Sequence, residues 1–101
     1  MRFLLHAKIP VEAGNRAIAA GTLSKDLQTL LADLKPEAAY FFEHDGCRSS
    51  MLIVNISDAS QIPSVAEPFF LKMNAEVRLH PVMTAEDLGK AGLDNLAQKW
   101  G

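Results

Sequence analysis

Cysteine is nearly absent from this sequence: Cys47 is the only one among 101 residues. A single cysteine excludes an internal disulfide and any metal cluster held by cysteines alone. We expect Cys47 to be a small, half-buried apolar residue rather than a reactive thiol.

An excess of charge is also missing, because 10 basic and 12 acidic side chains leave a net charge of −2. Such a chain has no basic surface to attract nucleic acid or anionic lipid, so neither is expected as a partner.

Long hydrophobic runs are absent as well. The opening segment MRFLLHAKIP is interrupted by His6 and Lys8, so it predicts neither a signal peptide nor a membrane span. We expect a cytoplasmic protein.

What is present is ordinary globular composition, with 49% apolar and 22% charged residues. A chain of this length buries roughly 60–70% of its unfolded surface, which is enough for one core. We therefore expect a single domain over residues 1–101.

The first half of the chain predicts a strand, a helix and a hairpin. Residues 2–9 alternate in polarity, which indicates a half-buried strand that Pro10 ends. From about Val11 to Leu34, leucines recur at spacings of three and four, as in an amphipathic helix. Gly14 and Gly21 weaken its first half, so an irregular start is expected there, with Asn15 a candidate N-cap.

Residues 38–57 predict a hairpin around Asp45-Gly46, with a two-residue loop if His44 faces Cys47. Glu43 would then lie opposite Arg48, an opposite-charge pair that supports this register.

The second half predicts a helix, a strand and a final helix. Asp58 or Ser60 can cap the first of these, Pro68 should kink or shorten it, and Asn74 can end it in the left-handed conformation. Residues 75–83 predict the fourth strand. Thr84 and Asp87 then form a capping box for the last helix.

This order is that of the α+β, ferredoxin-like βαββαβ fold plus a C-terminal helix. Its antiparallel sheet has strand order 4-1-3-2, with helices on one face and the other face bare. The helix-packed set should be Phe3, Leu5, Ala7, Ala39, Phe41, Leu52, Val54, Ile56, Val77 and Leu79.

The bare face receives the alternate residues, and it is too apolar to remain in water. Strand one lies beside strand four, so His6 should meet Arg78 or His80. We expect His80 and His6 to act as acid–base or hydrogen-bonding groups. The expected ligand-binding side chains are Arg78, Tyr40, Phe42, Met51 and Asn55.

The alternative interpretation is that both histidines are hydrogen-bonded residues of a subunit interface, and that His44, near the hairpin tip, is solvated. No metal is expected, because Glu76 and His80 are four residues apart on a strand, or ~13 Å.

The segments IPVEAGN (9–15), LKPEAAYF (34–41), IPSVAEPFF (62–70) and LHPVMTAEDL (79–88) make the chain resemble small bacterial members of the dimeric α/β-barrel superfamily. The strand ending in His80-Pro81 is also similar to muconolactone isomerase, over that segment alone. The resemblance implies a homodimer whose sheets pack into a barrel, without a cofactor. Any enzyme activity would be of the isomerase or monooxygenase type.

Three functions follow as hypotheses. The first is a homodimer that binds a small aromatic or lactone-like molecule, with or without transforming it. The second is a dimeric interaction module without a ligand. The third, RNA binding, shares the element order but needs exposed aromatic residues on strands one and three, where Leu4, His6, Ser49, Met51 and Ile53 stand instead.

Overall fold

The computed structural model describes all 101 residues as an α+β fold. The elements in chain order are β1 (Arg2–Ile9), α1 (Val11–Ala19), α2 (Leu23–Leu34), β2 (Ala38–His44), β3 (Cys47–Asn55), a short 3₁₀ helix η1 (Ala59–Gln61), α3 (Ile62–Met73), β4 (Glu76–Pro81), α4 (Ala85–Lys90) and α5 (Leu93–Trp100). No helix is long and apolar enough to cross a bilayer.

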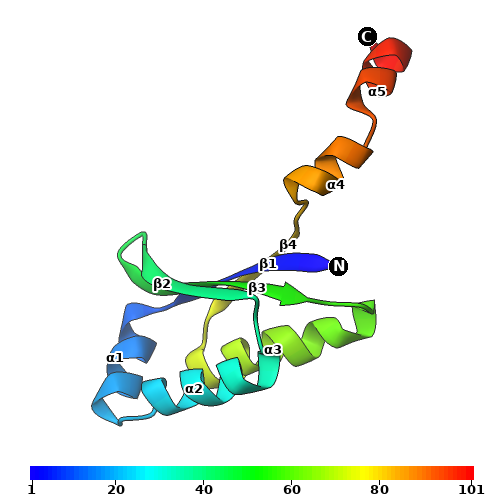
Figure 1. Cartoon of the computed structure of the whole chain (residues 1–101). Helices are drawn as coiled ribbons and strands as arrows, with labels where there is room; N and C mark the ends of the chain where they lie inside the picture. Colours follow the sequence, from blue (N-terminus) through cyan, green and yellow to red (C-terminus); the bar gives the residue numbers. More distant parts are fainter.

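The four strands form one antiparallel sheet of order β2-β3-β1-β4, which confirms the predicted ferredoxin-like order. Figure 1 shows α1, α2 and α3 together on one side of this sheet. The opposite face carries no helix layer, as predicted.

The core lies between the sheet and the three helices, and strand alternation fills it. Leu5, Leu52 and Phe69 are its largest fully buried side chains. The cluster as a whole comprises Leu5, Ala7, Ile9, Leu30, Leu52, Val54, Ile56, Val65, Phe69, Met73 and Ala75. Phe41 was expected here and is 54% exposed, because β2 is an edge strand and two cavities separate this side chain from the helices.

The single helix expected over residues 11–34 is two helices. Gly21 adopts a left-handed φ of 71°, which ends α1 and turns the chain into α2. Asn15 is not an N-cap, because α1 begins directly after Pro10. The side chain of Asn15 is instead free to accept a hydrogen bond from Arg48, at 3.1 Å.

The hairpin has the predicted two-residue turn, with left-handed φ at both Asp45 (51°) and Gly46 (77°). The predicted register is confirmed, since His44 pairs with Cys47 and Glu43 with Arg48. Asp58 caps η1, and α3 continues past Pro68 to Met73, so the proline does not shorten this helix.

The last helix is also two helices, broken at Gly92 with φ 71°. The predicted capping box is present, since Thr84 and Asp87 exchange hydrogen bonds of 3.0 Å. Figure 1 shows α4 and α5 reaching away from the domain on the side opposite α1–α3. The radius of gyration is accordingly 16.8 Å, against about 13 Å for a compact chain of this length. We call residues 84–101 the C-terminal arm.

Candidate functional site

The face of the sheet opposite the helices carries the candidate site, and one cross-strand row defines its centre. Tyr40 of β2 pairs with Met51 of β3, Met51 pairs with His6 of β1, and His6 pairs with Arg78 of β4. Side chains of directly paired residues are close neighbours on one face. The structure thus brings four of the predicted site residues into a single line.

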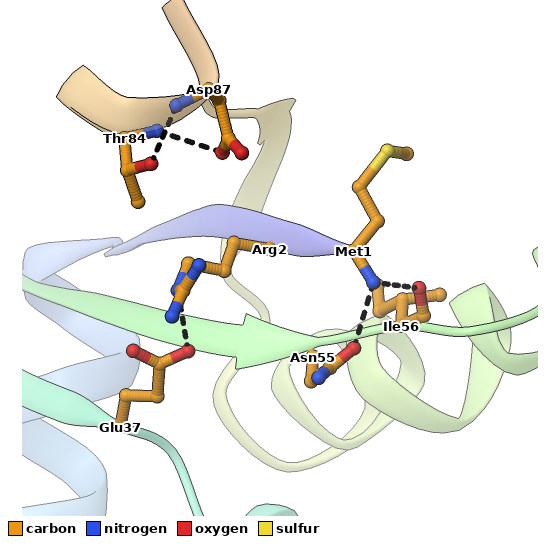
Figure 2. A network of polar contacts seen from close by, with 7 residues as sticks. All are labelled: Met1, Arg2, Glu37, Asn55, Ile56, Thr84 and Asp87. Atoms are coloured by element: carbon orange, nitrogen blue, oxygen red, sulfur yellow. Dashed lines mark hydrogen bonds and ion pairs between the residues drawn. The ribbon is translucent and has the colours of Figure 1, made fainter. Parts of the chain in front are cut away.

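Two further predicted site residues, His80 and Asn55, lie outside this row. His80 pairs with Leu4, so it lies one row from His6 and diagonal to it, not opposite. Asn55 lies at the far end of β3, where it pairs with Arg2 and its Oδ1 accepts a hydrogen bond from the Met1 amino group at 2.9 Å (Figure 2). Asn55 therefore stands apart from the imidazole at the centre.

The His6 imidazole packs against two rings that come from β2 and that also contact each other. It stacks on Phe42, with centroids 5.6 Å apart and planes 20° from parallel. His44 contacts it edge-on, with a centroid distance of 4.9 Å. Ser49, the residue paired with Phe42, has a short side chain, which leaves space for rings from β1 and β2 to meet above β3.

His44 is a member that the sequence analysis missed, since we expected it to be solvated. Its side chain is about half exposed, yet it contacts both His6 and Phe42. The period of two already put His44 on the same face as Phe42. Only the twist and curl of the hairpin bring it over β1.

The Nε2 atom of His6 is buried and has no hydrogen-bond partner within the chain. Burial lowers the pKa of His6 below its ordinary value of 6.5, and the charges of His44, Arg78, Lys8 and His80 lower it further. The ring is therefore neutral at neutral pH. A neutral imidazole can accept a proton or exchange a hydrogen bond with a bound molecule.

Charged groups border the aromatic cluster at the hairpin end. Lys8 Nζ lies 3.4 Å from a Glu76 oxygen and 3.8 Å from an Asp45 oxygen. His44 Nε2 also lies 3.4 Å from Asp45. No group of three His, Cys, Asp or Glu side chains is arranged to hold a metal ion.

Aromatic and aliphatic side chains cover much of the same face. Tyr40 is 66% exposed and Phe42 is 37% exposed, and Leu4, Met51 and Ile53 are partly exposed beside them. We call Leu4, Tyr40, Phe42, Met51 and Ile53 the apolar patch. An apolar surface of this kind usually marks an interface or a ligand site.

A separate cavity of about 580 Å³, which the sequence analysis did not predict, lies on the helix side of the hairpin. Its wall includes residues of α1, α2 and the strands β1, β2 and β3, and its polar members are Asn15, Glu43, Arg48, Ser49 and Ser50. The sequence carried one signal for it, the Glu43–Arg48 register, which places Arg48 on the helix side of β3.

Comparison with known proteins does not assign the chain to a family, so its class is argued from its topology. No protein-family model and no curated protein matches it. Among solved structures, the de novo designed protein Ferredog-Diesel is similar over 80% of this chain and 85% of its own, with a TM-score of 0.47 and 14% sequence identity. The βαββαβ connections and the strand order 2-3-1-4 place the chain in the ferredoxin-like class.

Proposed function

We propose that this protein is a homodimer whose two bare sheet faces pack together and hold a small aromatic or lactone-like molecule between them. The observation that carries the proposal is His6, whose buried Nε2 lacks a hydrogen-bond partner on a face rich in aromatic and apolar groups. An unpaired buried polar atom costs about 1–3 kcal/mol. A ligand that hydrogen-bonds to this atom would recover that energy.

Two further features support a second copy of the chain on this face. The apolar patch needs a cover, and packed sheets stand about 10 Å apart, a distance that side chains can span. The C-terminal arm also extends on this side of the sheet (Figure 1). Along α5, the side chains of Leu93, Leu96 and Trp100 are exposed. Helices of 6 and 8 residues are not stable without tertiary packing, so the arm needs a partner surface too.

In this proposal the residues of the cross-strand row and their neighbours contact different parts of the ligand. Tyr40, Phe42 and Met51 contact the apolar part of the ligand, and Arg78 binds an anionic or carbonyl group. His6, and His80 one row away, exchange protons or hydrogen bonds with it. A neutral His6 suits a general base, which would make the protein an isomerase-like or monooxygenase-like enzyme without a cofactor.

The second candidate is a dimeric interaction module in which the two faces leave no cavity. The exposed apolar patch and the C-terminal arm support this candidate as well as the first, because both features require only that another protein surface covers them. It differs from the first in its histidines: the double variant His6→Leu with His80→Leu should leave the dimer unchanged or tighter, since apolar residues often replace buried polar groups without loss.

Native mass spectrometry of freshly purified protein tests the proposal. We expect an assembly of two chains of 11.0 kDa with a reproducible extra mass, which His6→Leu should remove while the dimer persists. Leu71→Ala, on the outer side of α3 and 79% exposed, is the matched control and should retain it. A bare dimer would favour the interaction module, and a monomer at tens of micromolar would contradict both.

A further inference from the structure

The cavity of about 580 Å³ on the helix side of the hairpin is a second site, which shares Phe42 and Ser49 with the site on the opposite face but does not include His6. Its apolar wall is made of Ile9, Val11, Leu23, Leu27, Phe41, Phe42 and Cys47. Pockets for small molecules typically measure about 300–1,000 Å³ and carry a few polar groups in an apolar wall. His6, Arg78 and His80 do not line this cavity.

Arg48 is the cationic member of the wall, and α1 is shaped to receive it. Its Nη1 donates to Asn15 Oδ1 at 3.1 Å. A Cβ atom on Gly14 would stand 2.7 Å from the same nitrogen. Glycine lowers the stability of a helix when it lies inside one. At position 14, however, any larger residue would collide with the Arg48 guanidinium.

Arg48 forms no ion pair in this structure, although Glu43, which carries a carboxylate, also lines the cavity. Glu43, its cross-strand partner, instead accepts a hydrogen bond from the Gly46 amide at 3.0 Å. The Arg48 side chain is half-buried and bonded only to a neutral amide, so its guanidinium has donors left for a second partner.

Ser50 supplies an unpaired polar atom in the same wall. It is 2% exposed and its Oγ has no hydrogen-bond partner within the chain. Ser50 and Arg48 are two residues apart on β3, so both point to the helix side of the sheet. A buried hydroxyl of this kind is normally satisfied by some partner.

We infer that this cavity binds a small organic carboxylate with an aromatic or bulky aliphatic body. The carboxylate pairs with the Arg48 guanidinium, whose planar donors fit two carboxylate oxygens. The Ser50 hydroxyl donates a further hydrogen bond. The apolar body lies against Leu23, Leu27 and Phe41.

Isothermal titration of the full-length protein with 2-naphthoate, and with 2-naphthylmethanol as its uncharged counterpart, tests the inference. We expect 2-naphthoate to bind at least about tenfold more tightly, the ratio for a hydrogen-bonded charge pair. Arg48→Met should remove that preference, leaving the weak affinity for the alcohol unchanged. Equal affinities in the wild type, or a preference that survives Arg48→Met, would overturn the inference.

Gly14→Ala separates binding from folding. The added methyl displaces the flexible end of Arg48 and improves the helix, so the thermal midpoint should be unchanged or higher while 2-naphthoate binds several-fold more weakly. An unchanged affinity for 2-naphthoate in this variant would show that the position of Arg48 against Gly14 does not affect binding, and it would contradict the inference.

His6→Leu locates the ligand. It should leave 2-naphthoate affinity unchanged, so failure of the sheet-face proposal and failure of this one are distinguishable. A loss of binding in His6→Leu would place the ligand on the sheet face instead. Binding that appears only after Trp100→Ala would mean that the C-terminal arm of a second copy fills the cavity, which would equally overturn the inference.

Discussion

The His6 imidazole lies on the ring of Phe42, 5.6 Å away and 20° from parallel, although the two residues belong to strands separated by β3. This stacking removes the imidazole from water on a sheet face that has no helix layer. The protonation of His6 is therefore linked to the packing around it.

Stability should therefore depend on pH through His6. Its pKa is lowered in the folded protein, so below the ordinary value of 6.5 the unfolded chain binds the proton more readily. The free energy of unfolding should be at its full value above that pH and fall as the pH drops from 6.5 through the folded pKa. Urea unfolding between pH 7.5 and 4.5 measures this, and His6→Leu should flatten the dependence.

Phe42→Ala should raise the pKa of His6 toward its ordinary value, because the ring that desolvates the imidazole is lost. Titration of the His6 ring protons by NMR measures the change. Phe70→Ala, at an exposed aromatic position on α3, should leave the titration where it is. An unchanged His6 pKa in Phe42→Ala would mean that stacking is not the source of the desolvation.

Two glycines should respond in opposite directions to alanine. Gly46 has φ 77° in the hairpin turn, so Gly46→Ala should lower the free energy of unfolding by about 1 kcal/mol or more. Gly89 lies inside α4 without a positive φ and with open space around it, so Gly89→Ala should stabilise that helix by about 0.5–1 kcal/mol. Urea denaturation measures the first, and amide hydrogen exchange in α4 the second.

The C-terminal arm should matter to the dimer and not to the fold of one chain. Leu96 and Trp100 are exposed in the single chain, Trp100 by 77%. Leu96→Glu should therefore raise the dimer dissociation constant by about tenfold or more, through loss of roughly 1.5–3 kcal/mol of side-chain burial. Sedimentation equilibrium measures this.

Gln98→Glu adds the same charge on another part of α5 and serves as the control for Leu96→Glu. It should leave the dimer as it is. A dissociation constant that is the same in both variants would show that the apolar side of α5 is not buried between subunits.

Sequence pattern alone predicted the succession of strands and helical segments and the hairpin register. These depend on short-range rules, such as the alternation in residues 2–9, the proline after Ile9 and the two-residue turn at Asp45-Gly46. The sheet order followed from the arrangement that is usual for this succession of elements. The same alternation predicted that Tyr40, Met51, His6 and Arg78 share a face. Their functional roles stay predictions.

Only the tertiary structure decided how those side chains meet. Twist and curl of the hairpin bring Phe42 and His44 over His6, and the pairing of β1 with β4 sets Arg78, not His80, opposite it. The sequence indicated a weak first half of the helix over residues 11–34, but not that the chain breaks at Gly21. The break at Gly92, the exposure of Phe41 and the place of Arg48 beside Gly14 were likewise absent from the pattern. Periodicity specifies which face a residue occupies, whereas contacts between elements depend on angles and gaps that arise only when the helices pack on the sheet.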